Sequence, residues 1–234
     1  MRKAILFDAY GTLFNEGKES VPKIAENIVR KFRLKISPEE FFKNWKTNYL
    51  NIEDEVFFHK RPFKTIKEIN LESLTLTFKK FSINGSPSEF INDLFYLWSF
   101  PKLFPDVKKV LSDLKNNYIL GILSNTDNET LFSAIKHTKI EIDYVLTSEQ
   151  VESYKPNIEI FLKAREDLKL NKSKIVYVGN SLNDIIGAKR AGFKIIYVNR
   201  KKISLNKFLY SPDYEVKSLR LVPKIVKEAF GGIN

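Results

Sequence analysis

The amino-acid sequence predicts an α/β protein in which a doubly wound parallel sheet is interrupted by an inserted bundle of helices. From residue 101 onward, short apolar runs alternate with helical patterns. One more apolar run, residues 3–7, stands at the start of the chain, and only helical patterns lie between it and residue 101. Because a single strand buries little surface by itself, residues 3–7 are expected to pair with the later strands in one sheet.

Residues 17–100 are predicted to form a helical cap. Apolar residues recur there at intervals of three and four, as expected of helices with one buried face. Two helices are predicted over 20–32 and 65–81, and two more begin at Ser37 and Ser86. Each of these serines precedes a proline and lies three residues before a glutamate, a pattern typical of helix starts.

Residues 101–234 are predicted to complete the core together with residues 1–16. The continuous apolar strands of this part imply a sheet that helices cover on both faces, as in Rossmann-like proteins. The expected strands span 118–123, 144–147, 174–178, 194–198 and, at the edge of the sheet, 214–216. The expected helices span 106–116, 129–138, 157–168, 182–191 and 219–229.

Composition excludes several kinds of site. The 234 residues contain no cysteine and two histidines, which excludes disulfides, thiolate zinc sites, cysteine nucleophiles and multi-histidine metal sites. The net charge of +11 favours anionic partners. Because the basic residues are spread along the chain, we expect a small anionic substrate and no nucleic acid. No apolar run is long enough for a signal peptide or a membrane span, so a cytoplasmic protein is predicted, as a monomer or a homodimer.

Polar side chains follow the predicted central strands. They are Asp8 and Thr12, Ser124 and Asn125, Lys155, and Asn180 and Asp184. Parallel sheets bind ligands at the carboxyl ends of their strands, so these groups are expected to meet in one crevice. The set suits covalent attack by Asp8 on an anionic substrate, with Lys155 and the hydroxyl groups neutralising the developing charge. Asp184 is placed either to share a hard cation with Asp8 or to pair with Lys155.

The order and spacing of these residues resemble the haloacid dehalogenase superfamily of hydrolases, with an α-helical cap after the first strand. The matching motifs are Phe7-Asp8-Ala9-Tyr10-Gly11-Thr12-Leu13, Leu123-Ser124-Asn125, Lys155-Pro156 and Val178-Gly179-Asn180-Ser181-Leu182-Asn183-Asp184. The resemblance implies an Asp8 nucleophile, a covalent aspartyl intermediate and its hydrolysis by water. It also implies catalytic roles for Thr12, Ser124, Asn125 and Lys155, the last three of which would also bind the substrate.

The sequence has features of two reaction classes within this superfamily. Mg²⁺-dependent phosphatases carry a second aspartate two residues after the nucleophile, where this chain has Tyr10. A phenol with an ordinary pKa near ~10 is a poor proton shuttle at neutral pH. Tyr10 is similar instead to the 2-haloacid dehalogenases, which need no metal. Yet the arginine of their cap corresponds to Lys46 and their later tyrosine to Phe161, while Gly179 and Ser181 stand where they have serine and asparagine.

The fourth motif resembles the phosphatase pattern Gly-Asp-Ser-x-x-Asp with Asn180 at the first aspartate. The resemblance therefore implies a Mg²⁺ site made by Asp8, the carbonyl of Tyr10, Asn180 and Asp184. From this we predict a Mg²⁺-dependent phosphatase of a small phosphorylated metabolite, with Lys46 as a candidate substrate anchor. The alternatives are a metal-independent 2-haloacid dehalogenase and a binding protein on a weakened enzyme fold.

Overall fold

The computed structural model describes residues 2–15, 20–58, 60–203 and 211–231, and the chain divides into two compact units. The first unit contains the sheet and consists of Met1–Asn15, Lys102–Asn125 and Thr138–Asn234. The second unit is helical and consists of Glu16–Pro101 and Thr126–His137. Residues 17–100, which the sequence predicts as a cap, fall within the second unit, and their role as a cap stays a prediction.

The described residues form one six-stranded parallel sheet with the order β3-β2-β1-β4-β5-β6. Its strands are β1 (Ala4–Phe7), β2 (Ile119–Ser124), β3 (Tyr144–Thr147), β4 (Ile175–Gly179), β5 (Lys194–Val198) and β6 (Tyr214–Val216). β1 is fully buried between β2 and β4, where Phe7 pairs with Ile122 on one side and with Val178 on the other. Because the strand order runs outward from β1 in both directions, the carboxyl end of β1 lies where such sheets bind their ligands.

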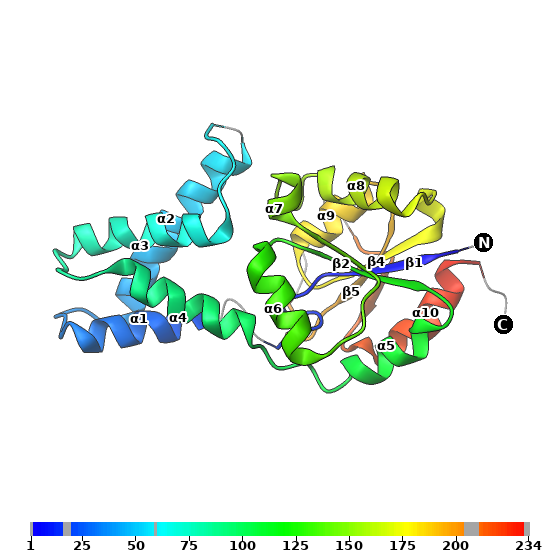
Figure 1. Cartoon of the computed structure of the whole chain (residues 1–234), viewed down its shortest axis with the longest axis horizontal. Coiled ribbons are helices and arrows are strands. Elements are labelled where there is room, and N and C mark those ends of the chain that lie inside the picture. The colour runs from blue at the N-terminus through cyan, green and yellow to red at the C-terminus, as the bar shows by residue number, and fades with distance from the viewer. Residues whose placement is uncertain (1, 16–19, 59, 204–210, 232–234) are drawn as a thin grey trace. The chain divides into compact units, whose positions relative to one another are not determined.

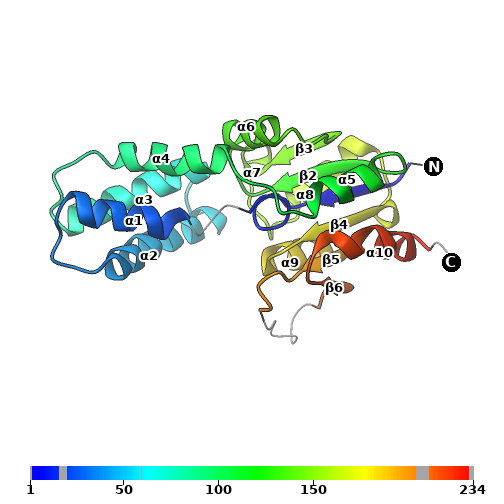
Figure 2. The same ribbon diagram turned by 90° about the horizontal axis from the view of Figure 1, so that it is seen from below.

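Helices cover both faces of this sheet (Figure 1). α5 (Val107–Lys115) and α10 (Val222–Ala229) lie on one face, and α8 (Glu159–Leu168) and α9 (Leu182–Arg190) lie on the other. Figure 2 shows α5 and α10 side by side. The unit is completed by a short helix, α7 (Ser148–Val151), and by the 3₁₀ turns Lys172–Lys174 and Leu219–Leu221. The predicted α/β fold with a doubly wound parallel sheet is thus confirmed.

Two elements of the sheet unit differ from the sequence-based expectation. The last helix was expected over 219–229, but α10 starts at Val222 because a 3₁₀ turn precedes the proline in its first turn. Helix α7 was not predicted. It begins at Thr147, whose side chain accepts a hydrogen bond from the backbone N–H of Gln150 while the Gln150 side chain accepts one from the backbone N–H of Thr147.

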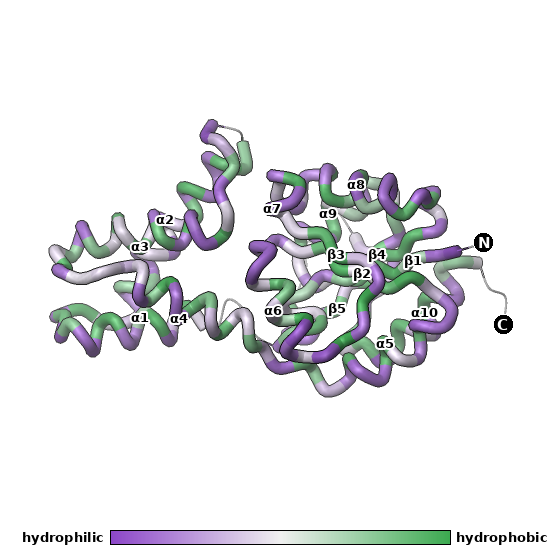
Figure 3. The backbone as a smooth tube through the Cα atoms, viewed as in Figure 1, coloured by the Kyte–Doolittle hydropathy of each residue, from purple (hydrophilic) through white to green (hydrophobic). Residues whose placement is uncertain are grey.

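The helical unit contains α1 (Ser20–Lys31), α2 (Pro38–Phe57), α3 (Ile66–Lys80), α4 (Pro87–Ser99) and α6 (Asn128–Thr138). Hydrophobic and hydrophilic residues alternate along these helices, as helices with one buried face require (Figure 3). Trp45 of α2 is 1% exposed, and its indole N–H donates to Ser73 Oγ at 3.0 Å. In the described part of the chain, no helix is long and apolar enough to cross a bilayer.

Helix α6 groups with the helical unit, although the sequence pattern assigned residues 129–138 to the core. Asp127, which precedes α6, accepts hydrogen bonds from the backbone N–H groups of Ile66 at 2.8 Å and Lys67 at 2.9 Å. These N–H groups lie in the first turn of α3, where they have no partner within the helix. The carboxylate also suits the positive end of the helix dipole. A contact between residues so far apart in sequence leaves no trace in the local pattern.

Candidate active site

Asp8 directly follows β1, at the carboxyl end of this central strand, and begins a tight turn. Its backbone N–H donates to the Val178 carbonyl at 2.8 Å, which extends the pairing with β4 by one residue. Gly11 follows with a φ of +87°, a conformation that glycine adopts without strain. The turn brings Thr12 back to Asp8, where the Thr12 hydroxyl donates to Asp8 Oδ2 at 3.2 Å. Thr12 is fully buried and Asp8 is 7% exposed.

Arg200, which follows β5, contacts the turn at Thr12 and anchors it to Asp106. Its guanidinium donates to the Thr12 carbonyl at 3.1 Å and to both carboxylate oxygens of Asp106 at 3.0 and 3.1 Å. The two-pronged contact with Asp106 fixes the plane of the guanidinium. Sequence analysis did not identify Arg200, because its partners Thr12 and Asp106 come from two segments that lie far from it in the sequence.

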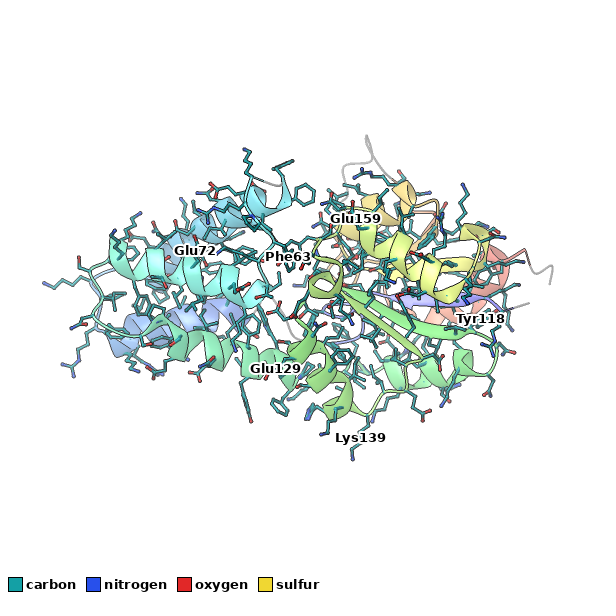
Figure 4. All side chains as sticks on the ribbon, turned by 45° about the horizontal axis from the view of Figure 1, so that its top comes forward. Phe63, Glu72, Tyr118, Glu129, Lys139 and Glu159 are labelled. Atoms are coloured by element: carbon teal, nitrogen blue, oxygen red, sulfur yellow. The ribbon has the colours of Figure 1, made fainter. Side chains whose placement is uncertain are left out.

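Asn125 holds the loop that carries Lys155. The Lys155 backbone N–H donates to Asn125 Oδ1 at 2.8 Å, and Asn125 Nδ2 donates to the Lys155 carbonyl at 3.0 Å. Two residues before Lys155, the Ser153 hydroxyl donates at 3.0 Å to the carboxylate of Glu159, the first residue of α8 and labelled in Figure 4. The contacts of the Asn125 side chain are therefore with the protein backbone, and its predicted role in substrate binding stays a prediction.

The ammonium group of Lys155 lies between two carboxylates. Lys155 Nζ is 2.7 Å from Asp8 Oδ1 and 2.7 Å from Asp184 Oδ1, and its side chain is 3% exposed. It also lies 2.9 Å from the Tyr177 hydroxyl and 3.1 Å from the Leu123 carbonyl. The sequence left open whether Asp184 shares a cation with Asp8 or pairs with Lys155, and in the structure it pairs with Lys155.

Asp184 accepts hydrogen bonds on both of its carboxylate oxygens. Oδ1 accepts from Lys155 and from the Tyr177 hydroxyl, the latter at 2.9 Å. Oδ2 accepts from the backbone N–H of Asn180 at 3.1 Å, and from the backbone N–H and hydroxyl of Ser181 at 3.0 and 2.7 Å. Ser181 and Asp184 form the capping box that starts α9. The Ser-x-x-Asp spacing is a sequence signal that could have identified this role.

Charge and burial set the protonation states of the three ionisable groups. Burial, opposed by Lys155 and reinforced by Asp184, raises the pKa of Asp8 to about 6. Burial also acts on Asp184, but Lys155 and the hydrogen-bond donors hold the pKa of this carboxyl below its usual value. The two carboxylates overcome burial at Lys155 and raise its pKa. At neutral pH the site therefore holds two carboxylates and one ammonium, with one net negative charge.

The predicted magnesium ligands make hydrogen bonds within the protein in this arrangement. Both oxygens of Asp184 are occupied by donors of the protein, and the side-chain amide Nδ2 of Asn180 donates to the Tyr10 carbonyl at 3.3 Å. A Cβ added to Gly11 would meet that Asn180 nitrogen at 1.9 Å, so the amide is packed tightly against the turn. Bound Mg²⁺ would require Asp184 and Asn180 to exchange their present partners.

The remaining predicted site residues lie in different units. Ser124 ends β2, the neighbour of β1, and is 2% exposed. Lys46 belongs to the helical unit, where it is exposed on α2. The structure thus brings together Asp8, Thr12, Asn125, Lys155 and Asp184, and the anchoring role of Lys46 stays a prediction. Tyr177 is a site residue that sequence analysis missed, because within an apolar strand it has the pattern of an ordinary core residue.

Known proteins resemble this chain over nearly its whole length. Residues 5–198 match the sequence profile of the haloacid dehalogenase-like hydrolases. The (S)-2-haloacid dehalogenase of Pseudomonas sp. strain YL is 27% identical, over 98% of this chain and 96% of that protein. The glyceraldehyde 3-phosphate phosphatase of Methanothermobacter thermautotrophicus is 28% identical, over 85% of this chain and 86% of that protein. The structure of the L-2-haloacid dehalogenase from Xanthobacter autotrophicus has the same fold, with a TM-score of 0.77 at 21% identity over 97% of this chain and 99% of that one.

Proposed function

Because the chain belongs to the haloacid dehalogenase-like hydrolases, we propose that it uses Asp8 to hydrolyse the carbon–halogen bond of a small 2-haloacid without a divalent cation. The observation that carries this proposal is the pairing at Asp184, whose two oxygens already accept hydrogen bonds from Lys155, Tyr177, Asn180 and Ser181. The 27% identity with the Pseudomonas haloacid dehalogenase supports the same reaction class. The Lys155 ammonium thus offsets one of the two negative charges of Asp8 and Asp184.

The contacts of Asp8 indicate which oxygen attacks. Oδ1 is held by Lys155 at 2.7 Å, whereas Oδ2 has the longer contact of 3.2 Å with the Thr12 hydroxyl. Oδ2 is therefore the more nucleophilic oxygen. It forms a bond to C2 of the haloacid while the carbon–halogen bond breaks, and the halide leaves with the bonding pair. The product of this step is an ester between Asp8 and the substrate.

Lys155 then assists the second step. Water adds to Cγ of the Asp8 ester, and the carbonyl electron pair moves onto Oδ1, next to the Lys155 ammonium. A donor placed where negative charge develops lowers the barrier to such a step. Collapse of the adduct breaks the bond between Cγ and Oδ2 and restores the carboxylate with an oxygen from water. One proton of that water stays on the released 2-hydroxy acid, and the other goes to solvent.

A Mg²⁺-dependent phosphatase of a small phosphorylated metabolite is the second candidate. Its support is the fourth motif, with the Gly-x-Ser-x-x-Asp frame of phosphatases around Asn180, and the 28% identity with the glyceraldehyde 3-phosphate phosphatase. In this function, Asp184 and Asn180 would have to give up their present hydrogen bonds to bind the cation. Phosphate release would then depend strictly on Mg²⁺.

Two assays separate the candidates. We expect chloride release from (S)-2-chloropropionate that persists in EDTA, and loss of it in Asp8→Asn, which keeps the size of the side chain. The competing outcome is release of phosphate from p-nitrophenyl phosphate or acetyl phosphate only when Mg²⁺ is added. Phosphatase activity of that kind, with no halide release at high enzyme concentration, would refute the dehalogenase proposal.

We also infer a cytoplasmic setting and a small anionic substrate as the partner of this enzyme. The net charge of +11 supports an anionic ligand. Light scattering during gel filtration would distinguish the monomer from the homodimer.

A further inference from the structure

Tyr177 is a buried phenol that the proposed mechanism does not use. It lies in β4, next to the central strand, and is 0% exposed. Its hydroxyl is 2.9 Å from Lys155 Nζ, 2.9 Å from Asp184 Oδ1 and 3.1 Å from the Leu123 carbonyl. Burial, reinforced by the nearby carboxylates, raises the pKa of Tyr177 well above its ordinary value, so the hydroxyl keeps its proton.

The protons of Lys155 and Tyr177 match the acceptors around them. Lys155 has three N–H protons and Tyr177 has one O–H proton. The acceptors within reach are Asp8 Oδ1, Asp184 Oδ1, the Leu123 carbonyl and the Tyr177 oxygen. When Tyr177 donates to Asp184 Oδ1, Lys155 donates to both carboxylates and to the Leu123 carbonyl, and each proton has a partner. Tyr177 therefore closes a network in which one N–H of Lys155 points at Asp8.

The ring of Tyr177 is held in place by the core. Phe161 of α8 packs against it edge to face, with ring centroids 5.1 Å apart. Phe161 is itself confined, because its ring is 6.0 Å from that of Phe193 and a Cβ added to Gly187 would lie 2.3 Å from it. A hydroxyl on so fixed a ring restrains its partners more firmly than a flexible side chain would.

We propose that Tyr177 is a positioning residue that holds the Lys155 ammonium on Asp8 Oδ1 while water hydrolyses the aspartyl ester, a role that rests on the function proposed above. Without the hydroxyl, Asp184 has one donor fewer and attracts the ammonium more strongly, away from Asp8. Ester formation consumes the negative charge of Asp8 and does not need this contact. Ester hydrolysis creates negative charge on Oδ1 and does need it.

The kinetic test compares Y177F with the matched control Y144F. Tyr144 also donates its hydroxyl to a carboxylate, Asp167 Oδ2, at 2.8 Å, but on the exposed side of the unit. Single turnovers of (S)-2-chloropropionate are quenched in acid, and the Asp8 ester is followed by intact mass. In Y177F we expect ester hydrolysis to slow about two- to tenfold, the range of one hydrogen bond, and ester formation to change by less than about twofold. If Y177F hydrolyses the Asp8 ester at the same rate as wild type and Y144F, the proposal is overturned.

A second measurement does not depend on the reaction. In protein labelled with ¹⁵N-lysine, the buried Lys155 ammonium is expected to give a slowly exchanging NMR signal, assigned by its absence in Lys155→Arg. We expect a nuclear Overhauser contact between this ammonium and the Tyr177 ring in wild type, and loss of the signal by faster exchange in Y177F but not in Y144F. If wild type releases no halide yet the signal behaves in this way, the proposed function fails and the positioning role stands. An unchanged Lys155 ammonium signal in Y177F would overturn the role of Tyr177. If Y177F fails to fold, the absence of a nuclear Overhauser contact between the ammonium and the Tyr177 ring in wild type would overturn it.

Discussion

Replacing Lys155 with methionine is expected to destabilise the sheet unit and to abolish turnover. Methionine is apolar and of similar length, so it keeps much of the packing of the lysine stem while removing the charge and the donors. The ammonium lies 2.7 Å from both Asp8 and Asp184, and its side chain is 3% exposed. Its loss leaves two carboxylates buried side by side with no counter-charge.

The size of the effect follows from burial. Removing one partner of a buried ion pair costs about 3–5 kcal/mol of unfolding free energy. In a protein of this size, about 2–4 °C of Tm corresponds to each kcal/mol, so we expect Tm to fall by about 6–20 °C. Protonation of Asp8, whose pKa burial raises to about 6 even beside Lys155, relieves part of this cost. A carboxyl whose pKa is higher in the folded state than in the unfolded state loses stability as pH rises, so the fall should be smaller at about pH 5 than at about pH 8.

Thermal unfolding followed by circular dichroism measures this effect. The matched control is Lys163→Met, which removes an ammonium from the exposed pair with Asp167 on α8. We expect its Tm to stay close to that of wild type, because exposed ion pairs add little to stability. The reasoning would be refuted by a loss in Lys155→Met no larger than in this control, or by a loss that is the same at both pH values.

Three further outcomes are expected. First, kcat/KM for the haloacid should rise with pH to a plateau with its midpoint near pH 6, because Asp8 attacks as the carboxylate and burial raises its pKa to about 6; initial rates across the pH range test this, and a flat profile would contradict it. Second, Asn125→Ala should lower the unfolding free energy by about 1–3 kcal/mol, since two hydrogen bonds to the Lys155 backbone are lost; urea titration measures the change, and a stability equal to that of wild type would be inconsistent with the bonds. Third, Asp184→Asn should lower both turnover and Tm because the ion pair with Lys155 is lost; restoration of turnover by added Mg²⁺ would instead point to a cation site.

Much of the fold could be predicted from the sequence because it depends on local patterns. The apolar run before Asp8 was expected to join the sheet because a single strand buries little surface by itself, and the structure places it between β2 and β4. Ser37 starts α2 where its spacing from Glu40 indicates. The grouping of helix α6 was not predicted, because Asp127 contacts Ile66 and Lys67 at the start of α3, which lie 61 and 60 positions away in the sequence. Amphipathic periodicity shows that a helix has a buried face but not what covers it.

The candidate site could likewise be predicted from the sequence only in part. The motif order alone brings Asp8, Lys155 and Asp184 to the carboxyl ends of neighbouring strands, since parallel strands all end at one edge of the sheet. It does not determine which oxygen meets which donor. Lys155 is 147 residues from Asp8 and 29 from Asp184, so their pairing is set by the packing of separate strands and loops.

The sequence by itself therefore determined the α/β fold, the ordered motifs and the position of the Asp8 carboxylate at the end of the first strand. These features follow from the period of apolar residues and from the placement of polar residues after the strands. Only the tertiary structure decided that Asp184 pairs with Lys155 and that Tyr177 completes the pair. The physical reason is that hydrogen bonds act over about 3 Å, a distance fixed by how the buried strands and helices pack and not by residue type alone.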